Sequence, residues 1–200
     1  MVAAAFFLIF AVVSFRLAAG LSGIDGIANF SPVAAVVLCG AAFLPKRFAI
    51  AVPLAAMLVT DLVLNHHYGA AFFTIGTLLR YLGFAAIFMI GLQLRDPEAR
   101  GPFAWKLLGG SIVGTLLFYV LSNTGAWLAS PGYAKTLAGW WQSQTLGLAP
   151  FPPSYLFLRN SLLGDLFFTG LFAACFALAY GTRSSLAPDS AALDGTPANH

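Results

Sequence analysis

The chain has 200 residues, of which 60% are hydrophobic and only 8% are charged. A soluble domain carries roughly 25% charged residues because its surface faces water, so this composition excludes a soluble globular protein and indicates one embedded in a lipid bilayer. The formal net charge of +3 comes from basic residues that stand singly or in pairs, a pattern without the basic patch that nucleic-acid binding requires.

Six apolar segments approach the roughly 20 residues that a helix needs to cross the hydrocarbon core. The first resembles a signal peptide in length but has no charged residue ahead of its apolar part, so we expect an uncleaved first helix. The expected spans are residues 2–20, 31–45, 48–66, 70–94, 104–128 and 155–180. Residues 1–182 would form one all-α membrane domain, and the polar residues 183–200 a disordered cytoplasmic tail.

Basic residues alternate between the expected loops. Lys46 and Arg47 lie between the second and third spans, and Arg95 and Arg100 lie between the fourth and fifth. The loops on the opposite side hold few basic residues. Because Lys and Arg accumulate in cytoplasmic loops, we expect a multi-pass protein with both termini in the cytoplasm.

The long stretch between the fifth and sixth spans has apolar residues at helical spacing, and prolines follow it. The residues at this spacing are Tyr133, Leu137, Trp140, Trp141, Gln144 and Leu148, and all but one of them lie on an apolar stripe of a helix. Paired tryptophans are typical of headgroup depth. We therefore expect an amphipathic interfacial helix over residues 133–148, which either covers the outer mouth of the bundle or is a plain linker resting on the membrane.

Three charged residues lie inside the expected spans. Arg80 is near the midplane of the fourth span, Asp165 is deep in the sixth, and Asp61 is near the outer end of the third. Each charge at mid-bilayer costs at least about 2.5–3.5 kcal/mol on insertion scales. We therefore expect a structural ion pair between Arg80 and Asp165, with Asp61 as the alternative partner.

Amides, carboxylates and tryptophans gather in the outer halves of the spans, whereas the inner halves are almost purely apolar. The candidate substrate-binding residues are Asn29, Asp61, Asn65, Asn123, Trp127, Trp140, Trp141, Asn160 and Asp165. Binding pockets combine apolar walls with a few convergent polar groups, so this asymmetry favours an outward-opening pocket over a continuous channel. Alternatively, the amides serve only as hydrogen bonds between helices.

The sequence contains no motif of a metalloprotease, a serine hydrolase or a nucleotide-binding loop, and we expect no cofactor and no metal. His66 and His67 are adjacent and would point about 100° apart on a helix, so they do not chelate a metal by themselves. A rival hypothesis is an intramembrane enzyme that acts on a lipid or cofactor through these histidines, Asp61 and Asp165. A third is an accessory subunit that binds no ligand.

Several short motifs resemble an uncharacterised bacterial family of proposed transport proteins. The matching residues are 29–35, 53–55, 61–62, 133–139 and 164–168, with Asn123, Trp127, Arg159 and Asn160. That family is distantly similar to the S components of energy-coupling factor transporters, small six-helix proteins that bind vitamins or metals from outside. The resemblance implies uptake of a small molecule, such as a vitamin-like compound, across a bacterial inner membrane.

The same resemblance implies a partner, the energising transporter module. S components often carry an Ala-xxx-Ala pattern on their first helix, where the energising subunit docks. In this chain the first span lacks the pattern, and Ala51 and Ala55 supply the spacing on the third span.

Overall fold

The computed structural model describes residues 2–21, 30–95 and 103–185. Over these residues every regular element is an α-helix, as the sequence predicted. The helices are α1 (Val2–Leu21), α2 (Val33–Phe43), α3 (Lys46–His67), α4 (Ile75–Gln93), α5 (Phe103–Ala129), α6 (Leu137–Gln144) and α7 (Ser154–Ser185).

Four of these helices are long and apolar enough to cross a membrane. The qualifying stretches are Phe48–His67 in α3, Ile75–Gln93 in α4, Trp105–Ala129 in α5 and Ser154–Cys175 in α7. The 11 residues of α2 cover only about 17 Å, roughly half of the hydrocarbon core. The helix α1 has 20 residues, Val2–Leu21, and the part of it whose side chains the structure describes contains the apolar stretch Phe10–Leu21. The chain thus has the make-up of a helical membrane protein, and four of the six expected spans correspond to described helices that are long and apolar enough to cross a bilayer.

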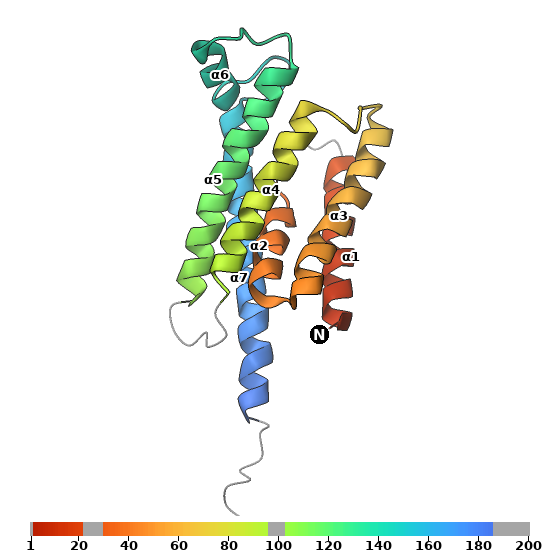
Figure 1. The fold of residues 1–200 in the computed structure, drawn as a ribbon, viewed down its shortest axis with the longest axis vertical. Coiled ribbons are helices and arrows are strands. Elements are labelled where there is room, and N and C mark those ends of the chain that lie inside the picture. The colour runs from red at the N-terminus through yellow and green to blue at the C-terminus, as the bar shows by residue number, and fades with distance from the viewer. Residues whose placement is uncertain (1, 22–29, 96–102, 186–200) are drawn as a thin grey trace, which may run out of the picture.

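Figure 1 shows α1, α3, α4, α5 and α7 running along one axis, with the short α2 among them and α6 at one end. The turn between α3 and α4 lies at the same end, which we call the α6 end. The connection between α2 and α3 lies at the opposite end. Successive connections thus lie at opposite ends of the bundle, as the predicted orientation requires. Which end faces the cytoplasm stays a prediction.

The helix expected over residues 133–148 is shorter in the structure. It begins after Thr136, whose hydroxyl accepts a hydrogen bond from the backbone N–H three residues later at 3.2 Å. Leu137 and Trp141, two residues of the predicted stripe, are 80% and 62% exposed, whereas Ser143 is fully buried. The face of α6 that packs on the bundle is therefore its small, polar one, and much of the apolar face points outward.

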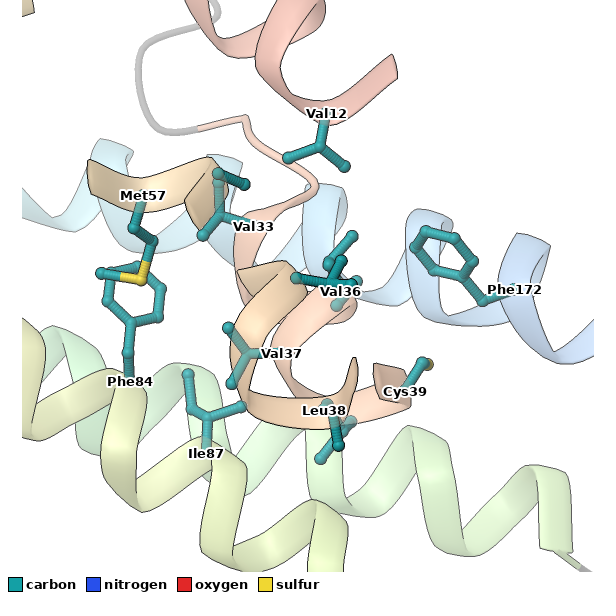
Figure 2. Close-up of a cluster of buried hydrophobic side chains, with 14 of the residues drawn as sticks. Val12, Val33, Val36, Val37, Leu38, Cys39, Met57, Phe84, Ile87 and Phe172 are labelled. Carbon is teal, nitrogen blue, oxygen red and sulfur yellow. The ribbon is translucent and has the colours of Figure 1, made fainter. Parts of the chain in front are cut away.

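The largest group of buried apolar side chains surrounds α2. Figure 2 shows α2 held between α4, α3 and α7, with one contact from α1. The labelled residues are Val12, Val33, Val36, Val37, Leu38, Cys39, Met57, Phe84, Ile87 and Phe172. Although α2 is too short to span a bilayer, it organises the packing of the longer helices.

The contact between α2 and α4 depends on Gly91. A Cβ atom added at this position would lie 2.5 Å from the carbonyl oxygen of Leu38, closer than real Cβ atoms approach. Small residues at such points let membrane helices pack closely, because packing rather than the hydrophobic effect drives their association.

The short α2 occupies only the half of the bundle away from α6 (Figure 1), and a group of aromatic rings links two of the longer helices. Phe15 of α1 meets Phe168 of α7 edge-on, with ring centres 5.5 Å apart. Phe30, just ahead of α2, lies 6.1 Å from the first ring and 5.6 Å from the second. These distances suit aromatic contacts, and the three rings join α1 to α7.

Candidate functional site

A buried carboxylate lies at the meeting point of three helices. Asp61 of α3 is only 3% exposed, and its Oδ1 lies 2.6 Å from Nη2 of Arg16 on α1. The hydroxyl of Tyr81 on α4 donates to the other carboxylate oxygen, Oδ2, at 3.1 Å. Arg16 also donates to the hydroxyl of Thr60. We call Arg16, Thr60, Asp61 and Tyr81 the Asp61 cluster.

Arg80 does not form the ion pair that the sequence predicted. Its Nη2 lies 3.3 Å from the hydroxyl of Thr77, a long hydrogen bond. Its buried Nε has no hydrogen-bond partner in the described part of the chain. The ion pair of the described residues joins Asp61 to Arg16 instead, because Arg16 lies near the end of α1 that packs against α3. Asp165, the other expected partner, is bound from α5.

A second buried donor without a partner among the described residues is Nδ2 of Asn65. Asn65 follows Asp61 by one turn of α3, and Arg80 is the neighbour of Tyr81 on α4. Both donors therefore lie within about one helical turn of the hydrogen bond between Asp61 and Tyr81. Buried polar groups are nearly always hydrogen-bonded, because each one left unpaired costs about 1–3 kcal/mol.

An apolar groove of about 650 Å³ lies between α3, the turn after it and α4. Its lining residues are Leu58, Phe72, Phe73, Thr74, Ile75, Thr77, Leu78 and Tyr81. Tyr81 belongs to the Asp61 cluster, and Thr77 is the residue on which the Arg80 guanidinium rests. The hydroxyl groups of Tyr81 and Thr77 thus lie at the edge of an otherwise largely apolar groove.

Asp165 belongs to a separate polar group, between α5 and α7. Its Oδ2 lies 2.6 Å from the hydroxyl of Thr115. One turn away on each helix, the hydroxyl of Thr169 in α7 lies 3.3 Å from the hydroxyl of Ser111 in α5. All four residues are buried. We call them the Asp165 cluster, and their described bonds fasten α5 to α7.

The predicted amides have other partners. Nδ2 of Asn123 donates to the carbonyl of Tyr119 in its own helix at 3.0 Å. The side-chain oxygen of Asn160 accepts from Arg159 at 3.2 Å. Asn29 lies outside the described residues. The amides that were expected to line one pocket with Asp61 are therefore engaged at least in part within their own helices.

The tryptophans fasten the segment after α5 back onto it. Nε1 of Trp127 donates to the carbonyl of Ala134 at 2.8 Å, and Nε1 of Trp140 donates to the hydroxyl of Thr124 at 2.9 Å. Trp141 is exposed. The first two are fixed at the junction of α5 and α6, at some distance along the chain from the Asp61 cluster.

Two further contacts hold the same junction. Nζ of Lys135 donates to the carbonyl of Ser130 at 2.7 Å and lies 5.7 Å from the ring centre of Trp127. It thereby places a positive charge at the C-terminal end of α5, where the helix dipole favours one. The hydroxyl of Tyr119 donates to the carbonyl of Gln144 at the end of α6.

Six of the predicted site residues thus lie in three places. Asp61 and Asn65 are beside the groove, Asn123, Trp127 and Trp140 are at the α5–α6 junction, and Asp165 is in the α5–α7 interface. His66 and His67, which the rival enzyme hypothesis would use with the two carboxylates, are exposed at the end of α3. The described bonds of Asp61 lead to α1 and α4, whereas those of Asp165 lead to α5.

Sequence reasoning missed the partners of Asp61. Arg16 carried a signal, since it is a charged residue inside an apolar helix. Thr60 and Tyr81 carried none, because hydroxyl-bearing residues are common in membrane helices and their direction depends on how the helices pack.

Comparison with known proteins gives one match. Residues 1–188 match the profile of a family of unknown function (DUF6580). No curated protein and no solved structure matches the chain. These comparisons give no support for a likeness to S components.

Proposed function

The chain belongs to this family of unknown function, and we propose from its geometry that it is a membrane-embedded protein that binds a small molecule for uptake. The observation that carries the proposal is the pair of buried, unpartnered donors, Arg80 Nε and Asn65 Nδ2, beside the hydrogen bond between Asp61 and Tyr81. A ligand with hydrogen-bond acceptors would satisfy both donors, and the neighbouring groove has the volume of ligand pockets, about 300–1,000 Å³.

Binding is favoured over catalysis by the state of the carboxylate. An acid or base in catalysis must lie within hydrogen-bond reach of a reacting atom. Both oxygens of Asp61 are occupied by groups of the protein, Arg16 and Tyr81. A carboxylate held in this way is suited to fixing the shape of a binding site.

Uptake needs a source of energy, and the likeness to S components implies a separate energising subunit as the partner. Ala51 and Ala55 lie one turn apart on α3, and both are exposed. Small residues at this spacing allow a neighbouring membrane helix to approach. We propose that the energising subunit contacts the exposed face of α3 that carries Ala51 and Ala55.

Native mass spectrometry of the purified protein tests the proposal. We expect the wild type to retain a small molecule that is released when the protein is unfolded. Asn65→Ala should reduce its occupancy, because the substitution removes one of the two donors. Trp141→Phe, an exposed position away from the groove, is the control. A wild type that retains nothing under any purification condition would remove the proposal.

A further inference from the structure

The charges around the groove do not balance. The Asp61 carboxylate is neutralised by Arg16, whereas the Arg80 guanidinium rests on the neutral hydroxyl of Thr77. The three charged side chains together carry +1. A cation within a membrane span is expensive unless an anion accompanies it, so the site is electrostatically complementary to a negative group.

The groove is lined by apolar side chains that are exposed at the surface of the bundle. Leu58, Leu78 and Phe73, which line the groove, are 37%, 55% and 92% exposed. Leu58 and Leu78 lie on helices long enough to span a bilayer, where exposed side chains face lipid rather than water, and Phe73 lies in the turn between these helices. The groove is therefore accessible from the lipid phase.

The packing of the helices keeps this side open. Although a short turn joins α3 to α4, α3 packs mainly against α1 and α2, and α4 mainly against α5 and α2. The described contact between the two helices includes the hydrogen bond between Tyr81 and Asp61. Tyr81, which makes this bond, and Thr77, which lies against the Arg80 guanidinium, both line the groove.

We propose that the ligand is an anionic amphiphile taken from the lipid phase, whose oxyanion headgroup binds Arg80 and whose apolar chain lies in the groove. This inference rests on the proposed function and names the substrate class. An anion without an apolar chain would leave the groove unfilled, and an apolar molecule without a charge would leave Arg80 uncompensated. A phosphate or carboxylate can accept two hydrogen bonds from the planar guanidinium, and Asn65 supplies a further donor.

The test uses full-length protein in vesicles of phosphatidylcholine, with and without a minor fraction of phosphatidylglycerol. After extraction in detergent, native mass spectrometry counts the phosphatidylglycerol retained per chain. We expect the wild type to retain it selectively over phosphatidylcholine. Arg80→Gln should lower the occupancy about tenfold, the change that corresponds to losing one charge-assisted interaction, and Arg80→Lys should give an intermediate loss.

A second test variant and a control variant accompany this experiment. Leu78→Trp would fill the groove and should also lower retention while Arg80 remains, so the inference stays testable if Arg80→Gln fails to fold. Arg95→Gln removes the same charge at the end away from α6, where Arg95 donates to the carbonyl of Leu44, and should leave retention unchanged. Equal retention by the wild type, Arg80→Gln and Leu78→Trp would overturn the inference.

A further arm separates this inference from the proposed function. The wild type in phosphatidylcholine alone is offered inorganic phosphate and, separately, acetate. Protection against thermal unfolding by either soluble anion, without selective lipid retention, would overturn the lipid source and leave a binding protein for a water-soluble ligand. Absence of both lipid retention and any co-purified molecule would remove the proposed function as well.

Discussion

The guanidinium of Arg16 and the carboxylate of Asp61 lie 2.6 Å apart, although 45 positions separate them in the chain. The contact joins α1 to α3, and Tyr81 extends it to α4. These polar contacts thus connect α1, α3 and α4.

We expect Arg16→Leu to destabilise the protein strongly. Only 4% of the Asp61 side chain is exposed, so removing Arg16 leaves a buried carboxylate without its charge partner, at a typical cost of about 3–5 kcal/mol. The double substitution Arg16→Leu with Asp61→Leu should recover much of the loss. Thermal unfolding in detergent measures both, and Arg159→Leu is the control. Equal melting temperatures for the single and the double variant would contradict the role of the pair.

Local signals in the sequence predicted the helices well. Pro32 and Pro45 bracket α2, and α3 begins directly after Pro45. A proline pair at 152–153 precedes α7, which begins at Ser154 against the expected residue 155. Such signals act through backbone angles and missing N–H groups of neighbouring residues, so they can be read without knowing the fold. The helix α7 runs to Ser185, three residues into the expected tail, and residues 186–200 lie outside the described residues.

Which arginine pairs with Asp61 could not be predicted from such local signals. Sequence position gives the depth of a residue along its helix, but neither the direction in which the side chain points nor the neighbouring helix. Arg16 and Arg80 could both reach the depth of Asp61, and the choice between them depends on α3 packing against α1. The shortened α6 has a similar cause, since the segment before it is fastened to α5 by Trp127.

Gly91→Ala should destabilise the packing of α2 on α4. The added methyl group would meet the carbonyl oxygen of Leu38 at 2.5 Å, and overpacking of this kind typically costs about 1–3 kcal/mol. Gly109→Ala is a matched control, because a Cβ atom there meets nothing within 4 Å and alanine favours a helix. Thermal unfolding should separate the two variants, with Gly91→Ala melting lower. Similar melting temperatures would argue that α4 can shift without penalty.

Trp140→Phe tests whether α6 is fixed to α5 or covers the groove. The substitution removes the hydrogen bond to Thr124, which should contribute about 0.5–1.5 kcal/mol. We expect faster amide hydrogen exchange in α6 and unchanged ligand retention, with the exposed Trp141→Phe as the control. A large loss of retention would instead support the lid that the sequence suggested.

The orientation of the chain decides which leaflet supplies the groove. Basic residues follow Pro45 at one end of the bundle, and Arg95 follows α4 at the same end, so the positive-inside rule places the α6 end outside. In a variant with Cys39 and Cys175 replaced by serine, single cysteines are introduced as His67→Cys, Thr145→Cys or Gln93→Cys. A membrane-impermeant maleimide added to intact spheroplasts should label the first two, which lie at the α6 end, and should reach the third only after the membrane is opened. The opposite pattern would reverse the orientation and make the cytoplasmic leaflet the source of the ligand.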